Sequence, residues 1–208
     1  MTLYYHPTGL PKEVAVQAAK LDLIGVDIET APLDWSDREY WRHPKGVALI
    51  TLAVGDDVHV VRPSGDNKWL IGLMGYPDVV KVFHHAMFDL TFMRHHLGVQ
   101  AQNVSCTKVA SKLLYPDRTK HSLSGLLQEH LGVEIDKGLS CSDWFAELSP
   151  EQLAYCANDV QHLVALDAAL TNQLLATNDL FSFADEAWRF LPVAVELRVT
   201  GYNDLFSY

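Results

Sequence analysis

Four acidic side chains stand at positions where a carboxylate could do chemistry. Asp27 and Glu29 lie inside the apolar segment 23–30 (LIGVDIET), and residues two apart on a strand point to the same face. Asp89 stands where a helix is expected to begin, and Asp159 lies within a segment of helical pattern. Carboxylates in an apolar strand are costly unless positive charge meets them. These four residues are therefore the candidates for a charged site.

Each acid also has an ordinary explanation when it is taken alone. Asp27 or Glu29 fits an edge or end position of a strand, and Asp89 fits a helix N-terminus, where the helix dipole favours a negative charge. Tyr155 and Asp159, one helical turn apart on the same face, fit a partly exposed tyrosine and a solvated aspartate. Their combination is what points to a common site.

If the four acids converge, like charges so close cannot all stay ionised without cations. Ligands that are all oxygen select hard divalent ions, Mg²⁺ or Mn²⁺, over zinc. Two such ions about 4 Å apart suit in-line displacement at phosphorus, since one activates the attacking water and the other stabilises the leaving oxygen. The acids therefore predict two divalent metal ions and phosphoryl chemistry.

The elements that must position these acids are predicted from hydrophobic pattern and turn residues. Segment 23–30 and segment 79–84 (VVKVFH) are apolar runs of strand length. Segments 47–54 and 58–61, joined by a Gly-Asp-Asp turn, predict a hairpin. Short helices are predicted over 12–20, over 87–97 before Gly98 and over 122–131 before Gly132.

The strongest helix start is Ser149-Pro150-Glu151-Gln152. Serine at the cap, proline in the first turn and glutamine three residues after the serine form a capping box. The pattern predicts one helix from Pro150 to about Leu175. Strands interleaved with helices, followed by a mainly helical C-terminal half, indicate an α/β or α+β layered domain.

Composition narrows the class of protein. The chain has 208 residues, a formal net charge of −10 and 49% hydrophobic residues, which favours one folded domain over a disordered chain. The acidic balance argues against a protein that coats nucleic acid non-specifically. No apolar run approaches the ~20 residues of a membrane span. The N-terminus does not resemble a secretory signal, and three cysteines outside any CxxC pair favour a cytoplasmic setting.

Three ordered motifs resemble a known superfamily. Asp27-Ile28-Glu29, then Asp89, then Tyr155-Cys156-Ala157-Asn158-Asp159 resemble the exonuclease motifs of the DEDD (DnaQ-like, ribonuclease H-fold) superfamily. The tyrosine four residues before the last aspartate resembles its DEDDy branch, which includes ribonuclease D and the proofreading domain of family A DNA polymerases. Further agreement lies in 121–123, 131–133, 136–139, 142–144 and 148–155.

The resemblance covers roughly residues 20–175 and implies a fold and an activity. The fold would be α/β, a ribonuclease H-like mixed β-sheet flanked by helices. The activity would be 3′–5′ exonuclease cleavage that releases nucleoside 5′-monophosphates from a single-stranded 3′ end. A histidine branch is excluded, because Ala154 stands five residues before Asp159.

The family pattern assigns roles to the acids. Asp27, Glu29 and Asp159 would hold the metal that carries the attacking water. Asp27 would bridge to a second metal, which Asp89 would reach through its water shell. Tyr155 would orient the water, since a phenol with a pKa near 10 suits hydrogen bonding better than base catalysis.

The resemblance also implies substrate contacts. Thr30 and Leu33 follow the first motif, where the family contacts the terminal nucleotide, often with an apolar wedge. His85 and Phe88 precede Asp89, and histidine here departs from the amide that relatives commonly present. Phe88 could stack a base, worth ~1–3 kcal/mol, or pack in the core.

Phosphate contact is expected from basic side chains downstream. The candidates are Lys137 and the cluster Lys108, Lys112, Arg118 and Lys120, and a solvated helix face is the alternative for each of them. Cys156 lies one helical step from Tyr155 and is expected to pack.

Two parts of the chain are expected, an exonuclease domain over 1–178 and a C-terminal helical tail over 179–208. The tail resembles the segment that links exonuclease and polymerase in family A polymerases, with Leu-Pro near the middle of a helix that ends in a glycine. The alternative is a helix that packs on the domain. Since the sequence ends at Tyr208, we expect a free-standing exonuclease, or one that works with a separate polymerase or other nucleic-acid-processing partner.

Other functions remain open at this point. A catalytically silent module that binds nucleic acid or a partner could keep the fold, although it would have no reason to keep four mutually repelling carboxylates. An internally cutting nuclease is a third possibility, and the tyrosine motif argues against it. The polymerase-like tail slightly favours DNA over RNA, whereas the ribonuclease D resemblance favours RNA.

Overall fold

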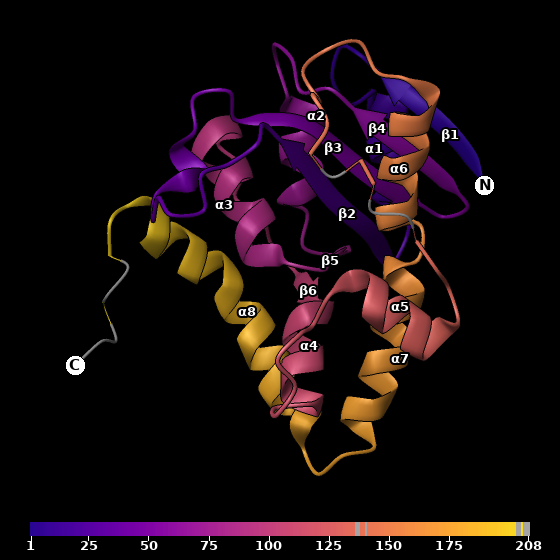
Figure 1. The fold of residues 1–208 in the computed structure, drawn as a ribbon, viewed down its shortest axis with the longest axis vertical. Coiled ribbons are helices and arrows are strands. Elements are labelled where there is room, and N and C mark those ends of the chain that lie inside the picture. Colours follow the sequence, from indigo (N-terminus) through magenta and orange to yellow (C-terminus); the bar gives the residue numbers. More distant parts are fainter. Residues whose placement is uncertain (136–137, 140, 203–204, 206–208) are drawn as a thin grey trace.

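One mixed six-stranded sheet forms the centre of the computed structural model, which describes residues 1–135, 138–139, 141–202 and 205 (Figure 1). The strand order is β1-β4-β3-β2-β5-β6. The β2–β3 and β3–β4 pairs are antiparallel, and the other pairs are parallel. The strands are β1 (Thr2–His6), β2 (Leu23–Thr30), β3 (Val47–Val54), β4 (Asp57–Val61), β5 (Val80–Phe83) and β6 (Val104–Cys106).

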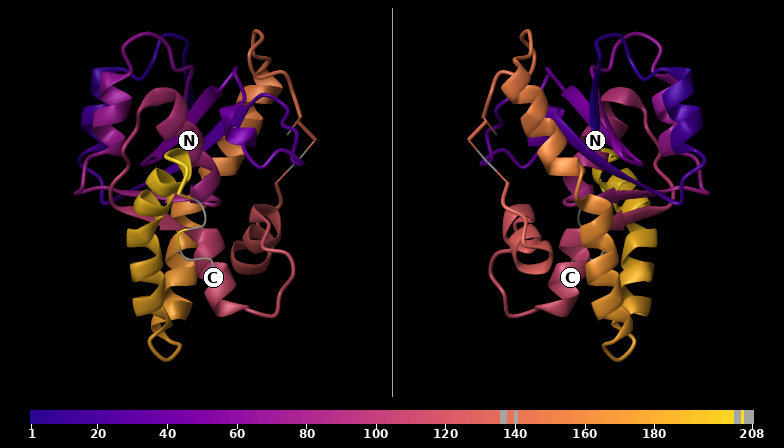
Figure 2. Two further views of the ribbon diagram at one scale, coloured as in Figure 1. Left: turned by 90° about the vertical axis from the view of Figure 1, so that its left-hand side faces the viewer. Right: turned by 90° about the vertical axis from the view of Figure 1, so that its right-hand side faces the viewer.

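Helices cover both faces of this sheet. Helix α6 packs across β1 to β4 on one face, and α1 and α2 lie on the opposite face (Figure 2). The helices are α1 (Lys12–Ala18), α2 (Lys68–Met74), α3 (Ala86–Leu97), α4 (Thr107–Leu114), α5 (Leu123–Leu131), α6 (Pro150–Val160), α7 (Leu163–Leu175), α8 (Leu180–Val199) and the short 3₁₀ helix η1 (Tyr40–Arg42). The predicted mixed sheet with flanking helices is confirmed.

The elements that carry the acids form as their patterns predict. Strand β2 occupies segment 23–30, and β3 and β4 form the predicted hairpin around Gly55, whose φ of 61° favours glycine. Helices α3 and α5 end at Gly98 and Gly132, both in the left-handed conformation. The ends of these elements were therefore readable from local residue chemistry.

The prediction of one helix from Pro150 to about Leu175 is wrong. The chain forms two helices, α6 and α7, with a change of direction at Gln161 and His162. Helix α6 packs on β1 to β4, whereas α7 packs on β2 and β5 and against α4, α5 and α8. No proline or glycine marks the break, so tertiary packing decides it over local propensity.

Some short elements carry too weak a local signal and were not predicted. Edge strand β1 pairs in parallel with β4, and β6 pairs in parallel with β5, so both depend on residues far away in the chain. Helix α2 has only seven residues. Non-local pairing and short length leave little periodicity to read.

Helix α8 packs on the domain. It lies against α3, α4, α7 and β6, and it buries Ala184, Trp188, Leu191 and Val195 in the main core. The Trp188 indole N–H donates to the carbonyl of Cys106 at 3.2 Å. Pro192 lies inside this helix, as the Leu-Pro pattern predicts. The packing favours the alternative in which the tail is a helix of the domain.

Candidate active site

The predicted acids converge in space. Carboxylate oxygens of Asp27, Glu29 and Asp159 lie within 4.8 Å of one another. Asp27 and Glu29 come from one face of β2, and Asp159 comes from α6, which covers that face. Asp89, buried in the first turn of α3, is near enough for its charge to raise the pKa of both Asp27 and Glu29. The site thus joins one strand and two helices.

Mutual repulsion and burial hold protons on this cluster. Burial first, and then the charges of Asp89, Glu29 and Asp159, raise the pKa of Asp27 well above its ordinary value. Burial and the charges of Asp159 and Asp89 raise the pKa of Glu29 to about 9. Burial raises the pKa of Asp89 to about 7, against the N–H of Ile28 and the charge of Lys108. The cluster can ionise fully only beside a cation.

The donor set fits a hard divalent ion. All three converging ligand atoms are carboxylate oxygens, the type that Mg²⁺ and Mn²⁺ prefer. Among the described residues, no other group of three or more His, Cys, Asp or Glu side chains has this spacing. A divalent ion would relieve the repulsion that raises the pKa values of these acids.

Tyr155 lies one turn before Asp159 and faces the same cluster. Burial, then the charges of Asp159, Glu29 and Asp27, and a hydrogen bond to Asp159 raise the pKa of its phenol. Its ring packs against buried Trp144, with centroids 5.6 Å apart. The phenol is therefore held protonated and oriented, which suits a hydrogen-bond donor and not a base.

Local chemistry fixes where α6 begins. The Ser149 side chain accepts from the N–H of Gln152 at 3.3 Å, and the Gln152 side chain accepts from the N–H of Ser149 at 3.0 Å. The predicted capping box is therefore confirmed. Arg62, which directly follows β4, holds the loop before α6 by donating to the carbonyl of Ala146 at 2.9 Å. These contacts set the position of Tyr155 and Asp159 above the sheet.

Gly25 allows the junction of α6 and α7 to approach β2. A Cβ at this position would lie 2.8 Å from the Val160 carbonyl oxygen and 3.3 Å from Cβ of both Ala53 and Leu163. The clash would be with backbone, which cannot give way as a flexible side chain can. Only glycine lets this backbone come so close, and Asp159 directly precedes Val160. The sequence analysis missed this residue.

We therefore expect Gly25→Ala to displace the helix junction and spread the carboxylates. The variant should melt at a lower temperature and bind Mg²⁺ more weakly than the unaltered chain. Gly72→Ala is the matched control, because a Cβ there meets nothing within 4 Å, and alanine favours the helix by about 1 kcal/mol. Thermal melts and calorimetric titration with Mg²⁺ measure both effects. Equal losses in the two variants would refute the role of Gly25.

The predicted substrate residues lie next to the elements that carry the acids. Thr30 directly follows Glu29, Leu33 stands three residues further along, and the β2–β3 pairing shifts register between Glu29 and Thr30, a bulge that re-aims side chains. The rings of His85 and Phe88 stack with centroids 6.1 Å apart at the start of α3, beside Asp89. Lys137 lies outside the described residues.

Phe88 belongs to a group of neighbouring aromatic rings, with Trp35 and Tyr40, that was not predicted from the sequence. Trp35, 68% exposed, lies 5.9 Å from Phe88 and 5.1 Å from Tyr40 between ring centroids. A cavity of about 560 Å³ opens beside these residues, lined also by Phe190 and Arg198 of α8. The loop 31–46 and α8 meet here through residues 100 or more positions apart, which sequence pattern could not join.

The predicted basic residues divide into two groups. Lys108 and Lys112 of α4, with Arg198 of α8, surround His85, whose pKa burial and these charges lower to about 4. No salt bridge involves these three cations in the part of the chain that the structure describes. They form a basic cluster beside Asp89.

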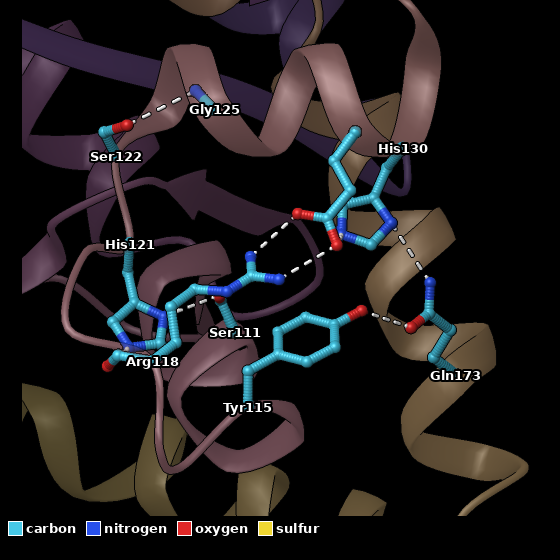
Figure 3. Close-up of polar contacts among 9 residues, drawn as sticks. Ser111, Tyr115, Arg118, His121, Ser122, Gly125, His130 and Gln173 are labelled. Carbon is cyan, nitrogen blue, oxygen red and sulfur yellow. Dashed lines mark hydrogen bonds and ion pairs between the residues drawn. The ribbon is translucent and has the colours of Figure 1, made fainter.

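Arg118 is already engaged, so the expectation of a phosphate contact from it is not supported. Its guanidinium pairs with both carboxylate oxygens of Glu129 at 2.8 and 2.9 Å and lies 4.1 Å from the Tyr115 ring (Figure 3). Tyr115 donates to Gln173 at 2.7 Å, and Gln173 bonds His130. This network ties α5 and the segment after α4 to α7, and it engages both terminal nitrogens of Arg118 with a carboxylate.

Cys156 packs in the interior, as predicted, and it also lies near Glu29 and Asp27. Its side chain is 1% exposed, and its pKa is raised by burial and then by the charges of Glu29 and Asp27. The thiol therefore sits against the strand face that carries these acids.

Comparison with known proteins agrees with this geometry. A family model described as 3′–5′ exonuclease matches residues 9–175. The chain belongs to the 3′–5′ exonuclease family. The predicted resemblance to exonucleases of the DnaQ-like superfamily is confirmed, and so is the prediction that the chain belongs to a family of enzymes, nucleic-acid hydrolases.

The relatives include proteins named as ribonucleases. Ribonuclease D of Xanthomonas oryzae is 33% identical over 189 residues, which is 89% of this chain and 49% of that protein. NrnC of Brucella melitensis is 31% identical with a TM-score of 0.87, and the match covers 100% of this chain and 99% of that chain. Further structures of NrnC hold Mg²⁺ and pGG. The chain spans about half the length of the curated relatives it matches.

More distant structures share the fold. RNase D of Escherichia coli is 22% identical with a TM-score of 0.76, over 92% of this chain and 50% of that chain. The ribonuclease H-like exonuclease fold is therefore confirmed. Among the described residues, no helix is both long and apolar enough to cross a membrane.

Proposed function

We propose that the chain is a metal-dependent exonuclease that removes nucleoside 5′-monophosphates from the 3′ end of single-stranded RNA. The observation that carries this is the convergence of Asp27, Glu29 and Asp159 within 4.8 Å, beside buried Asp89. A silent module would gain nothing from these four carboxylates, since burial raises the pKa of Asp27, Glu29 and Asp89, and neighbouring charges raise the pKa of Asp27 and Glu29 further. The family membership supports the same reaction.

The residues have distinct roles in this proposal. Asp27, Glu29 and Asp159 would hold one divalent ion, and Asp27 together with Asp89 would serve a second. Bound Mg²⁺ or Mn²⁺ ions would supply Lewis acidity to the attacking water and to the leaving oxygen. Tyr155 donates a hydrogen bond that orients the water for in-line attack. Glu29 and Asp159 fix that position from two different elements, β2 and α6.

We propose RNA as the substrate, in place of the slight preference for DNA that the tail suggested. Curated relatives are named ribonuclease D and exosome complex component 10, and α8 packs against α3, α4, α7 and β6 of the domain. NrnC, matched over the whole of both chains, binds pGG. We propose that this chain also accepts RNA as short as two nucleotides.

The basic cluster supports short substrates. Lys108, Lys112 and Arg198 surround His85 at the start of α3, one turn before Asp89. We propose that these cations hold a substrate phosphate on the 5′ side of the cleaved bond. Phe88 and Trp35 offer aromatic faces for bases, and Thr30 and Leu33 contact the terminal nucleotide. Residues 1–178 would form the catalytic unit, and Arg198 of α8 would contribute to the basic cluster beside it.

A length series tests the substrate. The chain is incubated with Mg²⁺ and equal amounts of pGG, a longer single-stranded RNA and the DNA of the same sequence, and release of mononucleotides is followed by chromatography. We expect RNA to be cut faster than DNA and pGG to be converted fully. Faster cleavage of DNA would overturn the RNA preference, and intact pGG would overturn the short-substrate proposal.

Tyr155→Phe should slow hydrolysis by less than about 100-fold, because the phenol only orients the water. Ring packing against Trp144 is kept, so the melting temperature should change little. Initial rates with Mg²⁺ at saturating RNA measure the effect. A loss as large as that of a missing metal ligand would show that the phenol does more than orient.

We also propose a reducing, cytoplasmic setting. The proposal is supported by three free cysteines, of which Cys106 and Cys156 are buried and Cys141 is exposed.

A further inference from the structure

Thr51 is a buried polar residue whose hydroxyl lacks a strong hydrogen-bond partner. Its side chain is 1% exposed, and its Oγ1 makes no hydrogen bond of ordinary geometry to the described residues. A buried hydroxyl without a strong partner destabilises the folded state. Valine has the same shape and branching without this cost, and every other residue of β3 is apolar. The hydroxyl therefore needs an explanation.

The register of the sheet places Thr51 beside the proposed metal site. Thr51 is the direct antiparallel partner of Asp27. Side chains of such partners point to the same face, with Cβ atoms about 4.5–5.5 Å apart. The Thr51 hydroxyl thus lies on the face that carries Asp27 and Glu29, under α6.

Cys156 covers the other side of this hydroxyl. A weak hydrogen bond between the Thr51 hydroxyl and the thiol lowers the pKa of Cys156, against the larger effects of burial and of the charges of Glu29 and Asp27, which raise it. A protonated thiol is only a weak hydrogen-bond partner. The strong acceptor on this face is the carboxylate of Asp27.

We propose that Thr51 is a positioning residue that donates a hydrogen bond to the Asp27 carboxylate when a divalent ion is bound. The inference rests on the metal site proposed above. An ionised carboxylate is a strong hydrogen-bond acceptor, and Asp27 lies directly across the strand pair from Thr51. Removing a side chain that orients a metal ligand typically weakens metal affinity 10- to 100-fold.

Metal titration of the full chain tests this role. Binding of Mn²⁺ is followed by electron paramagnetic resonance of the free ion for the unaltered chain, Thr51→Val and Thr51→Ser. We expect Thr51→Val to raise the dissociation constant by about 10-fold or more, and Thr51→Ser to restore most of the affinity. A role in packing alone predicts the reverse order, because valine matches the shape of threonine and serine leaves a cavity.

Two further variants separate the possible failures. Thr91→Val is the matched control, since Thr91 is equally buried but its hydroxyl bonds the Met87 carbonyl within α3, and we expect unchanged affinity. Asp27→Asn tests the metal site itself. Weakened binding in Asp27→Asn with normal binding in Thr51→Val would overturn the role of Thr51 and leave the site standing. Normal binding in both variants would overturn the site and this role together.

Discussion

Asp27→Asn is expected to reduce exonuclease turnover by at least about 1,000-fold, which corresponds to about 4 kcal/mol of lost transition-state stabilisation. The charges of Asp89, Glu29 and Asp159 each raise the pKa of Asp27, so this residue lies close to all three of the other acids. An amide keeps the size of the side chain but loses its charge, and divalent ions bind it more weakly.

The same substitution should leave the fold intact. Asparagine removes a group whose ionisation repels its neighbours, so the melting temperature without metal should not fall. Asp22→Asn is the matched control, an exposed acid just before the same strand. Initial rates on single-stranded RNA and thermal melts give both quantities. The Asp22→Asn control should cleave at the rate of the unaltered chain. An Asp27→Asn enzyme that cleaves as fast as this control would remove Asp27 from the site.

Glu29→Gln is expected to stabilise the metal-free protein at alkaline pH while abolishing activity. The pKa of Glu29 is about 9 in the folded chain and 4.5 in its ordinary state, so between these values the folded state binds more protons than the unfolded state. Stability without metal is therefore fully present below pH 4.5 and is lost as pH rises towards about 9. Glutamine is neutral throughout and does not take part in this loss.

Thermal melts in EDTA across this range measure the effect. The unaltered chain should melt at falling temperature as pH rises, and Mg²⁺ should restore it. Glu29→Gln should show a shallower fall and gain less from Mg²⁺, where each kcal/mol shifts the melting temperature by about 2–4 °C. Glu13→Gln, an exposed position on α1, is the control and should follow the unaltered chain. A pH-independent melt in EDTA would contradict the repulsive cluster.

The acids and the tyrosine could be predicted because their chemistry is local. Asp27 and Glu29 stand out in an apolar strand, and Tyr155 and Asp159 share a helix face one turn apart. The start of α6 was readable from the capping box at Ser149. Such signals depend on neighbours within a few residues, which a single sequence displays.

The residues that support the site depend on contacts far apart in the chain. Gly25 matters because Val160 lies over it, and Thr51 matters because it pairs with Asp27. Arg198 comes beside His85 only when α8 packs on α3. The break between α6 and α7 has the same origin, since nothing at Gln161 or His162 marks it locally. Long-range packing therefore decides what local pattern cannot.

The direction and metal dependence of cleavage test the central claim most directly. A single-stranded RNA labelled at its 5′ end is incubated with the chain in Mg²⁺, in EDTA and with Asp27→Asn in Mg²⁺, and the products are resolved by length. The carboxylate site predicts a ladder that shortens step by step from the 3′ end with Mg²⁺ only, and intact RNA in the other two reactions. Shortening that persists in EDTA, or internal cuts without a ladder, would contradict it.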